Sequence, residues 1–270
     1  MQSMQRRSSP EIEIIPWFHF QDTTLHANGV KYLESIQAGS DFFWEPTANA
    51  FKLCEMVAGG DSPRKIERFY NAVSGSKADI GEIVGHVEQL YEIFEVCKAR
   101  NLHFLPLDTP KIKAIEVRSR GSGELNRIKV NIQRENLWLK RICVRAATTK
   151  KGKIYISTGT YHAQSLRNLL SDAGLRATVQ TGFFTGRQQK DIEYLIHSGF
   201  EVRKAYLEKR WHDAYKIYIQ REIKISSLWQ KYRRGYRSWW LRVPTVYSLT
   251  VGKRKSRPKI LLPKPRKRRL

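Results

Sequence analysis

The stretch Lys153-Ile-Tyr-Ile-Ser-Thr-Gly-Thr-Tyr-His162 decides the fold of this chain, together with residues 163–174 that follow it. Residues 154–157 predict a short strand, and residues 163–173 have the spacing of an amphipathic helix. Strands that alternate with helices indicate βαβ units and a parallel sheet. His162 stands where the strand ends, and ligands of parallel sheets bind at the carboxyl ends of strands.

The stretch Glu11-Ile-Glu-Ile-Ile-Pro-Trp-Phe-His19 repeats this arrangement near the N-terminus. Residues 12–20 predict a buried strand that Pro16 interrupts. A short apolar strand at residues 42–44 leads in the same way to Glu45. Because parallel strands end at one edge of a sheet, we expect both strand-end histidines and Glu45 to lie together.

The rest of the chain alternates between helices and strands. Helices are predicted over residues 24–37, 48–57, 65–73, 80–100 and 125–147, and further strands over residues 103–108 and 175–179. Residues 109–124 are expected to form an exposed loop. This alternation predicts an α/β fold with a mostly parallel β-sheet and flanking helices.

The C-terminal third differs in pattern and in charge. Residues 187–241 are helical and amphipathic, and Pro244 ends that pattern. We therefore expect an α/β domain over residues 11–185, a basic amphipathic helical extension over residues 186–243, and a disordered basic tail over residues 244–270.

Positive charge is concentrated at the C-terminus. The formal net charge is +24, and residues 221–270 contain 17 Lys and Arg against one acid, a net charge of +16. Such a segment attracts nucleic acid or another polyanion. In residues 229–240, basic residues alternate with aromatic ones. The aromatic side chains would stack on nucleobases or, alternatively, pack on the core. The candidate nucleic-acid-binding residues are Arg233, Arg234, Arg237, Lys253, Arg254, Lys255, Arg266, Lys267, Arg268 and Arg269.

Several classes of protein are not supported by the sequence. Cys54, Cys97 and Cys143 form no CxxC pair, so neither a zinc–thiolate site nor a disulfide scaffold is indicated. There is no P-loop, dinucleotide fingerprint or GxSxG nucleophile elbow. No signal peptide or transmembrane segment is predicted, and we expect a cytoplasmic protein.

Both histidine segments resemble the TraB/Tiki superfamily, which also takes in erythromycin-esterase-like and ChaN-like proteins. Gly159-Thr-Tyr-His162 matches the GxxH motif that this family has at a strand end, and Leu169-Leu170 before Ala173-Gly174 fits the helix after it. His19 and Glu45 lie 26 residues apart, like the first histidine and the second-strand glutamate of the family.

Two further motifs extend the resemblance over residues 11–180. Leu107-Asp108-x-Pro110 resembles the middle strand of the family, and Arg134-Glu-Asn-x-Trp138-x-x-x-Ile142 resembles its arginine-bearing helix. Pro16 departs from the pattern, because a glycine is usual there. The superfamily includes metal-dependent peptidases and hydrolases of other bonds, so the resemblance implies a hydrolytic site of unknown substrate.

His19, Glu45 and His162 form the candidate site. Two imidazoles and a carboxylate are a suitable ligand set for a divalent metal ion, which would activate water or polarise a carbonyl. Without a metal, one histidine would act as a general base that Glu45 orients. Arg134 would stabilise an oxyanion or hold a substrate carboxylate. The alternative is that both histidines are ordinary strand-end residues held by local hydrogen bonds.

Three neighbouring residues keep two interpretations each. His26 is either a further ligand or a surface histidine near a helix start. Asp108 either supports the site or caps the turn that follows. Tyr161 either donates to an oxyanion or packs. The function predicted from these observations is a TraB/Tiki-like hydrolase, and the alternative is a non-enzymatic scaffold that binds nucleic acid through its basic C-terminus.

Overall fold

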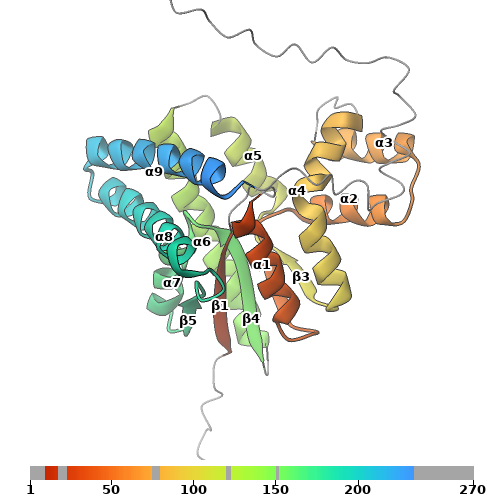
Figure 1. Ribbon diagram of the computed structural model, residues 1–270, viewed down its shortest axis with the longest axis horizontal. Coiled ribbons are helices and arrows are strands. Elements are labelled where there is room, and N and C mark those ends of the chain that lie inside the picture. The colour runs from red at the N-terminus through yellow and green to blue at the C-terminus, as the bar shows by residue number, and fades with distance from the viewer. Residues whose placement is uncertain (1–9, 18–22, 75–79, 120–122, 150–151, 234–270) are drawn as a thin grey trace, which may run out of the picture.

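The computed structural model describes residues 10–17, 23–74, 80–119, 123–149 and 152–233 (Figure 1). Its centre is a five-stranded sheet in the order β3-β2-β4-β1-β5, in which all paired strands are parallel. The strands are β1 (Glu11–Trp17), β2 (Asp41–Trp44), β3 (His103–Pro106), β4 (Lys153–Gly159) and β5 (Ala177–Val179). The α/β class predicted from the sequence is confirmed.

Helices connect the strands and cover both faces of the sheet. They are α1 (Thr24–Ser35), α2 (Ala48–Ala58), α3 (Pro63–Ser74), α4 (Ile80–Ala99), α5 (Pro110–Ser119), α6 (Glu124–Thr148), α7 (Ala163–Asp172), α8 (Gly186–Leu207) and α9 (Trp211–Tyr232). A helix between successive parallel strands is what a crossover connection requires.

Pro16 does not interrupt β1, contrary to expectation. Strand β1 pairs with β4 over its whole length, but with β5 only through Ile14. Ile12 N donates to Arg176 O, and Ile14 O accepts from Gln180 N, so this set of alternate residues turns its backbone groups toward β5. Pro16 belongs to the same set and lies beyond the last β5 pair. Its missing N–H therefore breaks no hydrogen bond of the sheet.

Each face of the sheet has its own hydrophobic core. The core under α6 and α7 includes Ile12, Ile14, Phe43, Ile154, Ile156, Trp138, Ile142, Leu166 and Leu170. The core under α1 and α4 includes Ile15, Trp17, Phe42, Trp44, Tyr155, Leu33, Ile93 and Val96. Side chains alternate between faces along each strand, so these near-continuous apolar strands are buried on both sides.

The loop expected over residues 109–124 is wrong for most of its length, because residues 110–119 form α5. Thr109 Oγ1 accepts a hydrogen bond from Ile112 N at 3.2 Å, which caps the first turn. Pro110 stands at the first helical position, where its fixed φ is favourable. Ile112 is buried in the core next to the sheet. The glycines and basic residues that predict a loop come later in the chain, from Arg118 onward.

The expected helical extension forms two helices as far as Tyr232, α8 and α9, which pack against each other beside the sheet (Figure 1). Its last residues, 234–243, and the expected tail at 244–270 lie outside the described residues. Helix α8 contacts α6 and α7, and α9 contacts α6. Ile192, Leu195 and Leu228 join the hydrophobic core of the α/β layer. In the part of the chain that the structure describes, no helix is long and apolar enough to cross a membrane.

Candidate functional site

The candidate site lies at the carboxyl edge of the sheet. Glu45 follows β2 and His162 follows β4, which is the neighbour of β2. Thr158 Oγ1 and Gly159 N donate to Glu45 Oε1 at 2.8 and 3.1 Å, so the end of β4 holds this carboxylate. His162 Nε2 is 3.9 Å from Glu45 Oε1. The structure therefore brings two of the three predicted residues together, while His19 lies outside the described residues.

His162 is buried and fixed on its other side by a residue that sequence reasoning missed. Its Nδ1 lies 2.8 Å from Oε1 of Glu135, a fully buried carboxylate on α6. The imidazole also meets the rings of Trp138 and Tyr161 edge-on, at centroid distances of 4.8 and 5.0 Å. A carboxylate only accepts hydrogen bonds, so Nδ1 carries the proton. In the neutral ring, Nε2 then presents its lone pair toward Glu45.

Arg134 is held by a buried ion pair. Its Nη2 and Nε donate to the Asp108 carboxylate at 2.9 and 3.4 Å, and Trp138 Nε1 donates to Asp108 Oδ1 at 2.9 Å. Asp108 thus supports the arginine of the site, whereas Thr109 provides the cap. Burial raises the pKa of the Asp108 carboxyl; Arg134 opposes this shift and Glu45 adds to it. Glu45 is thus close enough to Asp108 for the negative charge of one acid to oppose ionisation of the other.

Two arginines from α8 and α9 reach the same strand end. Arg203 on α8 donates to Glu135 Oε2, and Arg221 on α9 donates to Thr160 Oγ1 at 2.8 Å. The Arg221 guanidinium also lies over the Tyr161 ring, 5.2 Å from its centroid. Burial raises the pKa of Tyr161, and the nearby Glu135 adds to the shift. Tyr161 thus packs as a neutral phenol between Arg221 and His162.

A metal site cannot be completed from the described residues, which contain no group of three His, Cys, Asp or Glu side chains placed to hold an ion. Glu45 and His162 are close enough to share one ion, since their facing atoms are 3.9 Å apart. The third ligand predicted from the sequence is His19, which is outside the described residues. The ligand set stays a prediction.

His26 is not a surface residue, and its ring contacts Trp17 and Glu92. It is buried in the first turn of α1, where its ring meets Trp17 edge-on at 4.8 Å. Its Nε2 is 3.0 Å from Glu92 Oε2 on α4. The expectation of an exposed histidine is wrong because the N-terminus of α1 is covered by α4. His26 links these two helices.

Of the candidate nucleic-acid-binding residues, Arg233 is the one within the described range. It is exposed, its guanidinium lies 5.1 Å from the centroid of the Trp229 ring, and its backbone forms an isolated β-bridge with Thr23. Arg234, Arg237, Lys253, Arg254, Lys255, Arg266, Lys267, Arg268 and Arg269 lie outside the described residues. Thr23 is the N-cap of α1, so Arg233 at the end of α9 lies beside the start of α1.

The fold and this edge site define a parallel α/β protein in which a buried histidine lies between two carboxylates. No protein-family model, curated protein or solved structure matches the chain. The function therefore has to be argued from the chemistry of the site.

Proposed function

We propose that the chain is a hydrolase of the TraB/Tiki-like group whose centre is formed by His162 and Glu45. Arg134 is the third residue of this centre, because the Trp138 ring contacts both Arg134 and His162. The observation that carries the proposal is the pair of carboxylates around His162: Glu135 on Nδ1 and Glu45 facing Nε2. A carboxylate on the far nitrogen selects the tautomer whose Nε2 accepts a proton and stabilises the imidazolium that then forms.

The separation between Nε2 and Glu45 suits the activation of water. At 3.9 Å, the two atoms are too far apart for a hydrogen bond, yet one water molecule can bond to both. His162 would take a proton from this water while Glu45 orients it for attack on the substrate. Arg134, aligned by Asp108, would stabilise negative charge that develops on the substrate.

The resemblance also implies a divalent metal ion, which Glu45 and His162 would hold together with His19. Such an ion would polarise the scissile bond. Elemental analysis of the purified protein beside His162→Ala tests this part of the proposal. A metal that copurifies in equal amount with both proteins would argue against this ligand set.

The hydrolytic centre is tested by His162→Ala on a panel of chromogenic carboxylic esters, peptide anilides and phosphate esters. Loss of a general base lowers turnover by about 10²–10⁴-fold. His197→Ala is the matched control, because His197 is an exposed histidine on α8. Circular dichroism establishes that each variant is folded. An unchanged rate in folded His162→Ala would remove His162 from the mechanism.

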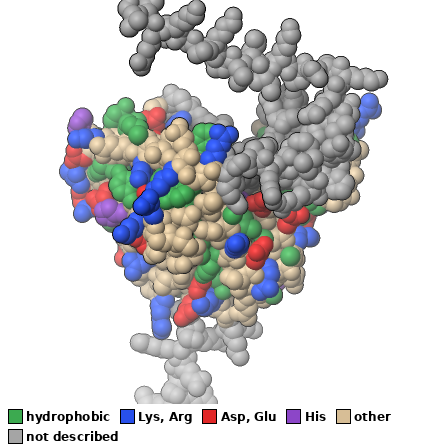
Figure 2. Space-filling model, viewed as in Figure 1, with side chains coloured by type: hydrophobic (Ala, Val, Ile, Leu, Met, Phe, Trp, Pro, Cys, Tyr) green, Lys and Arg blue, Asp and Glu red, His purple; other side chains and the backbone are tan. Residues whose placement is uncertain are grey.

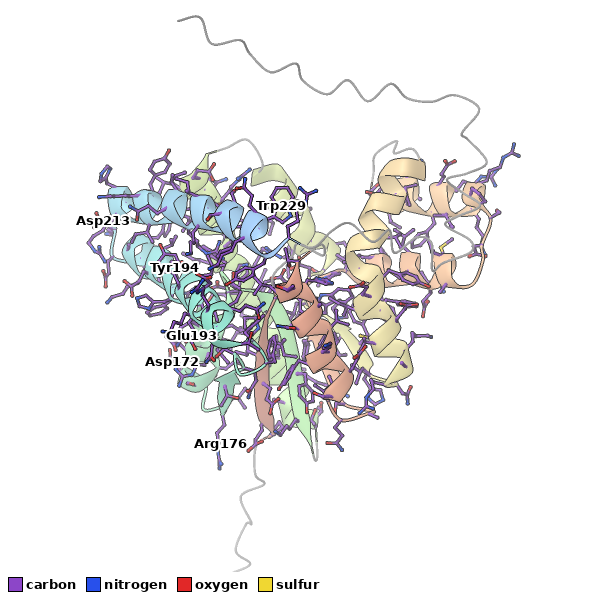
Figure 3. All side chains as sticks on the ribbon, viewed as in Figure 1. Asp172, Arg176, Glu193, Tyr194, Asp213 and Trp229 are labelled. Carbon is purple, nitrogen blue, oxygen red and sulfur yellow. The ribbon has the colours of Figure 1, made fainter. Side chains whose placement is uncertain are left out.

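We propose nucleic-acid binding through the basic C-terminus as a second candidate function. Figure 2 shows Lys and Arg side chains among hydrophobic ones over α8 and α9. Lys224 lies over the ring of Tyr194 at 5.8 Å, and Arg233 over that of Trp229 at 5.1 Å. Figure 3 labels Tyr194 on α8 and Trp229 on α9. Cations next to partly exposed rings suit the phosphates and bases of a single strand.

Truncation before residue 243 tests this second function. Fluorescence anisotropy with a labelled single-stranded RNA of about 20 nucleotides should show affinity that falls steeply with salt in the full chain. The truncated protein should bind more weakly and with a shallower salt slope. Equal slopes for both proteins would exclude the tail as the binding segment. Hydrolysis is expected to be the same in both, because the two functions use different segments.

A further inference from the structure

We propose that α8 and α9 complete the site, with Arg203 and Arg221 as positioning residues that fix His162 without touching the substrate. The inference rests on the proposed function in one respect, since it takes His162 to be the proton acceptor. Neither arginine lies within residues 11–185, to which the sequence resemblance and the predicted α/β domain are confined.

Arg203 acts through Glu135. The carboxylate of Glu135 is completely buried, one oxygen facing His162 Nδ1 and the other Arg203 Nη1. A buried carboxylate is stable as an ion only when it is paired and hydrogen-bonded. Arg203 provides that pairing, and its own side chain is 11% exposed. The guanidinium thus keeps Glu135 available as the acceptor that orients the imidazole.

Arg221 acts through the backbone turn that carries His162. Its side chain is buried and donates to Thr160 Oγ1 and to Leu195 O on α8. It also covers the Tyr161 ring. Thr160 and Tyr161 are the two residues between β4 and His162, so a guanidinium from α9 holds the segment that aims the histidine. Burial lowers the pKa of Arg221, so a desolvation cost opposes the charge of this cation.

A third contact shows that α8 is seated directly on this turn. Gly199 lies one helical turn before Arg203, and a Cβ built on it would be 2.6 Å from Tyr161 O and 2.8 Å from Tyr161 Cα. Only a residue without a side chain allows so close an approach of helix and turn. Residues four apart lie on the same helix face, so the approach of Gly199 brings Arg203 to Glu135.

The arrangement predicts what happens to the imidazole when Arg203 is lost. Glu135 then loses the guanidinium that fixes one of its oxygens, while its other oxygen still faces His162 Nδ1. The carboxylate is free to shift, and the imidazole that it orients changes position with it.

The experiment uses the full chain with ¹⁵N-labelled histidine, and His162→Ala identifies the ring signals of His162 among the seven histidines. Arg203→Gln should shift these signals, because it releases one oxygen of Glu135. Arg203→Lys, which keeps the charge, should return them toward their wild-type positions. Lys204→Gln is the matched control and should leave them in place, since it removes an exposed cation from the same helical turn.

Hydrolysis is measured on the same proteins. Loss of a residue that orients a catalytic group lowers activity by about 10- to 100-fold, so Arg203→Gln and Arg221→Lys should fall in that range and Lys204→Gln should equal the wild type. The lysine side chain is too short to reach both Thr160 and the face of Tyr161, so Arg221→Lys should also shift the His162 signals. If Arg203→Gln does not fold, Arg221→Lys decides: a rate equal to the wild type would overturn the proposal.

The two proposals fail in different ways. Unshifted His162 ring signals in folded Arg203→Gln would overturn the positioning role, whatever the activity. Absence of hydrolysis in the wild type, with shifted His162 signals in Arg203→Gln, would refute the proposed reaction and still show that α8 positions the imidazole.

Discussion

Asp191 joins α8 to α9 at the level of a single residue. Its Oδ2 accepts from Lys231 Nζ at 2.6 Å and from Tyr232 Oη at 2.7 Å, and its Oδ1 is 2.9 Å from Lys224 Nζ. Burial opposes ionisation, but these hydrogen bonds outweigh it and lower the pKa of Asp191 to about 2. The carboxylate therefore stabilises the fold, in contrast to Asp108, whose pKa is raised.

The shift in Asp191 predicts how stability depends on pH. A folded-state pKa below the unfolded value gives stability that is present above about pH 4 and is lost as the pH falls through 2. The advantage of the wild type over Asp191→Asn should thus shrink by about 2 kcal/mol between about pH 5 and pH 2. Urea unfolding at several pH values measures it.

Asp172 provides the control for this experiment. It is an exposed aspartate on α7, and Figure 3 shows it on the outside of the molecule. Asp172→Asn should change stability by less than about 0.5 kcal/mol at every pH. A constant difference between Asp191→Asn and the wild type over the same range would contradict the lowered pKa.

At the residue scale, the sequence predicts the site residues at the strand ends but not the distant arginines that hold them. Glu45 and His162 were predicted from strand positions, because a parallel sheet sends its strand ends to one edge. Glu135 had a signal, since it follows Arg134 within a recognised motif. Arg203 and Arg221 had none, because their partners lie 68 and 61 residues away. The packing of the helices determines which distant charges pair. The hydrophobic periodicity of the sequence carries no information about this packing.

At the scale of elements, the seat of α8 depends on Gly199. Alanine has the better helix propensity by about 1 kcal/mol, which would favour Gly199→Ala in an isolated helix. Here the new Cβ would be 2.6 Å from a backbone oxygen that cannot turn aside. We expect the clash to outweigh the gain in helix propensity. Gly199→Ala should therefore destabilise the protein by about 1–3 kcal/mol, as is usual for overpacking.

Gly182→Ala is the control for Gly199→Ala. Nothing lies within 4 Å of a Cβ at Gly182, so this change should leave stability nearly unaltered. Chemical denaturation of both variants gives the comparison. A Gly199→Ala protein as stable as the wild type would mean that α8 can move away from Tyr161 at little cost. The positioning role of Arg203 would then lose one of its supports.

Elements with strong start signals and clear periodicity were predicted well, and α5 shows where this fails. The long helix expected over residues 125–147 corresponds to α6 (Glu124–Thr148). For α5, the cap Thr109 and the first-position Pro110 were present in the sequence. The run Arg118-Ser-Arg-Gly-Ser-Gly123 favours a loop, but it begins only at the last two residues of α5. Burial of Ile112 against the sheet supplies the packing that short helices need.

Over the whole molecule, positive charge is concentrated in residues 234–270. The predicted hydrolytic centre is built from paired charges, whereas residues 234–270 contain 13 Lys and Arg and no acid. Salt should therefore affect binding to polyanions far more than it affects the buried pairs of the site. The β-bridge between Thr23 and Arg233 places the last described residue beside the start of α1.

The strand order has a consequence for how the protein is made. Strand β1 is synthesised first, yet its two neighbours are β4 and β5, which come more than 130 residues later. During translation the apolar residues of β1 stay unpaired until β4 and β5 have been synthesised. Such non-local pairing slows folding and leaves an aggregation-prone strand uncovered. A ribosome stalled before residue 153 should carry a nascent chain that is readily digested by protease and retained by chaperones.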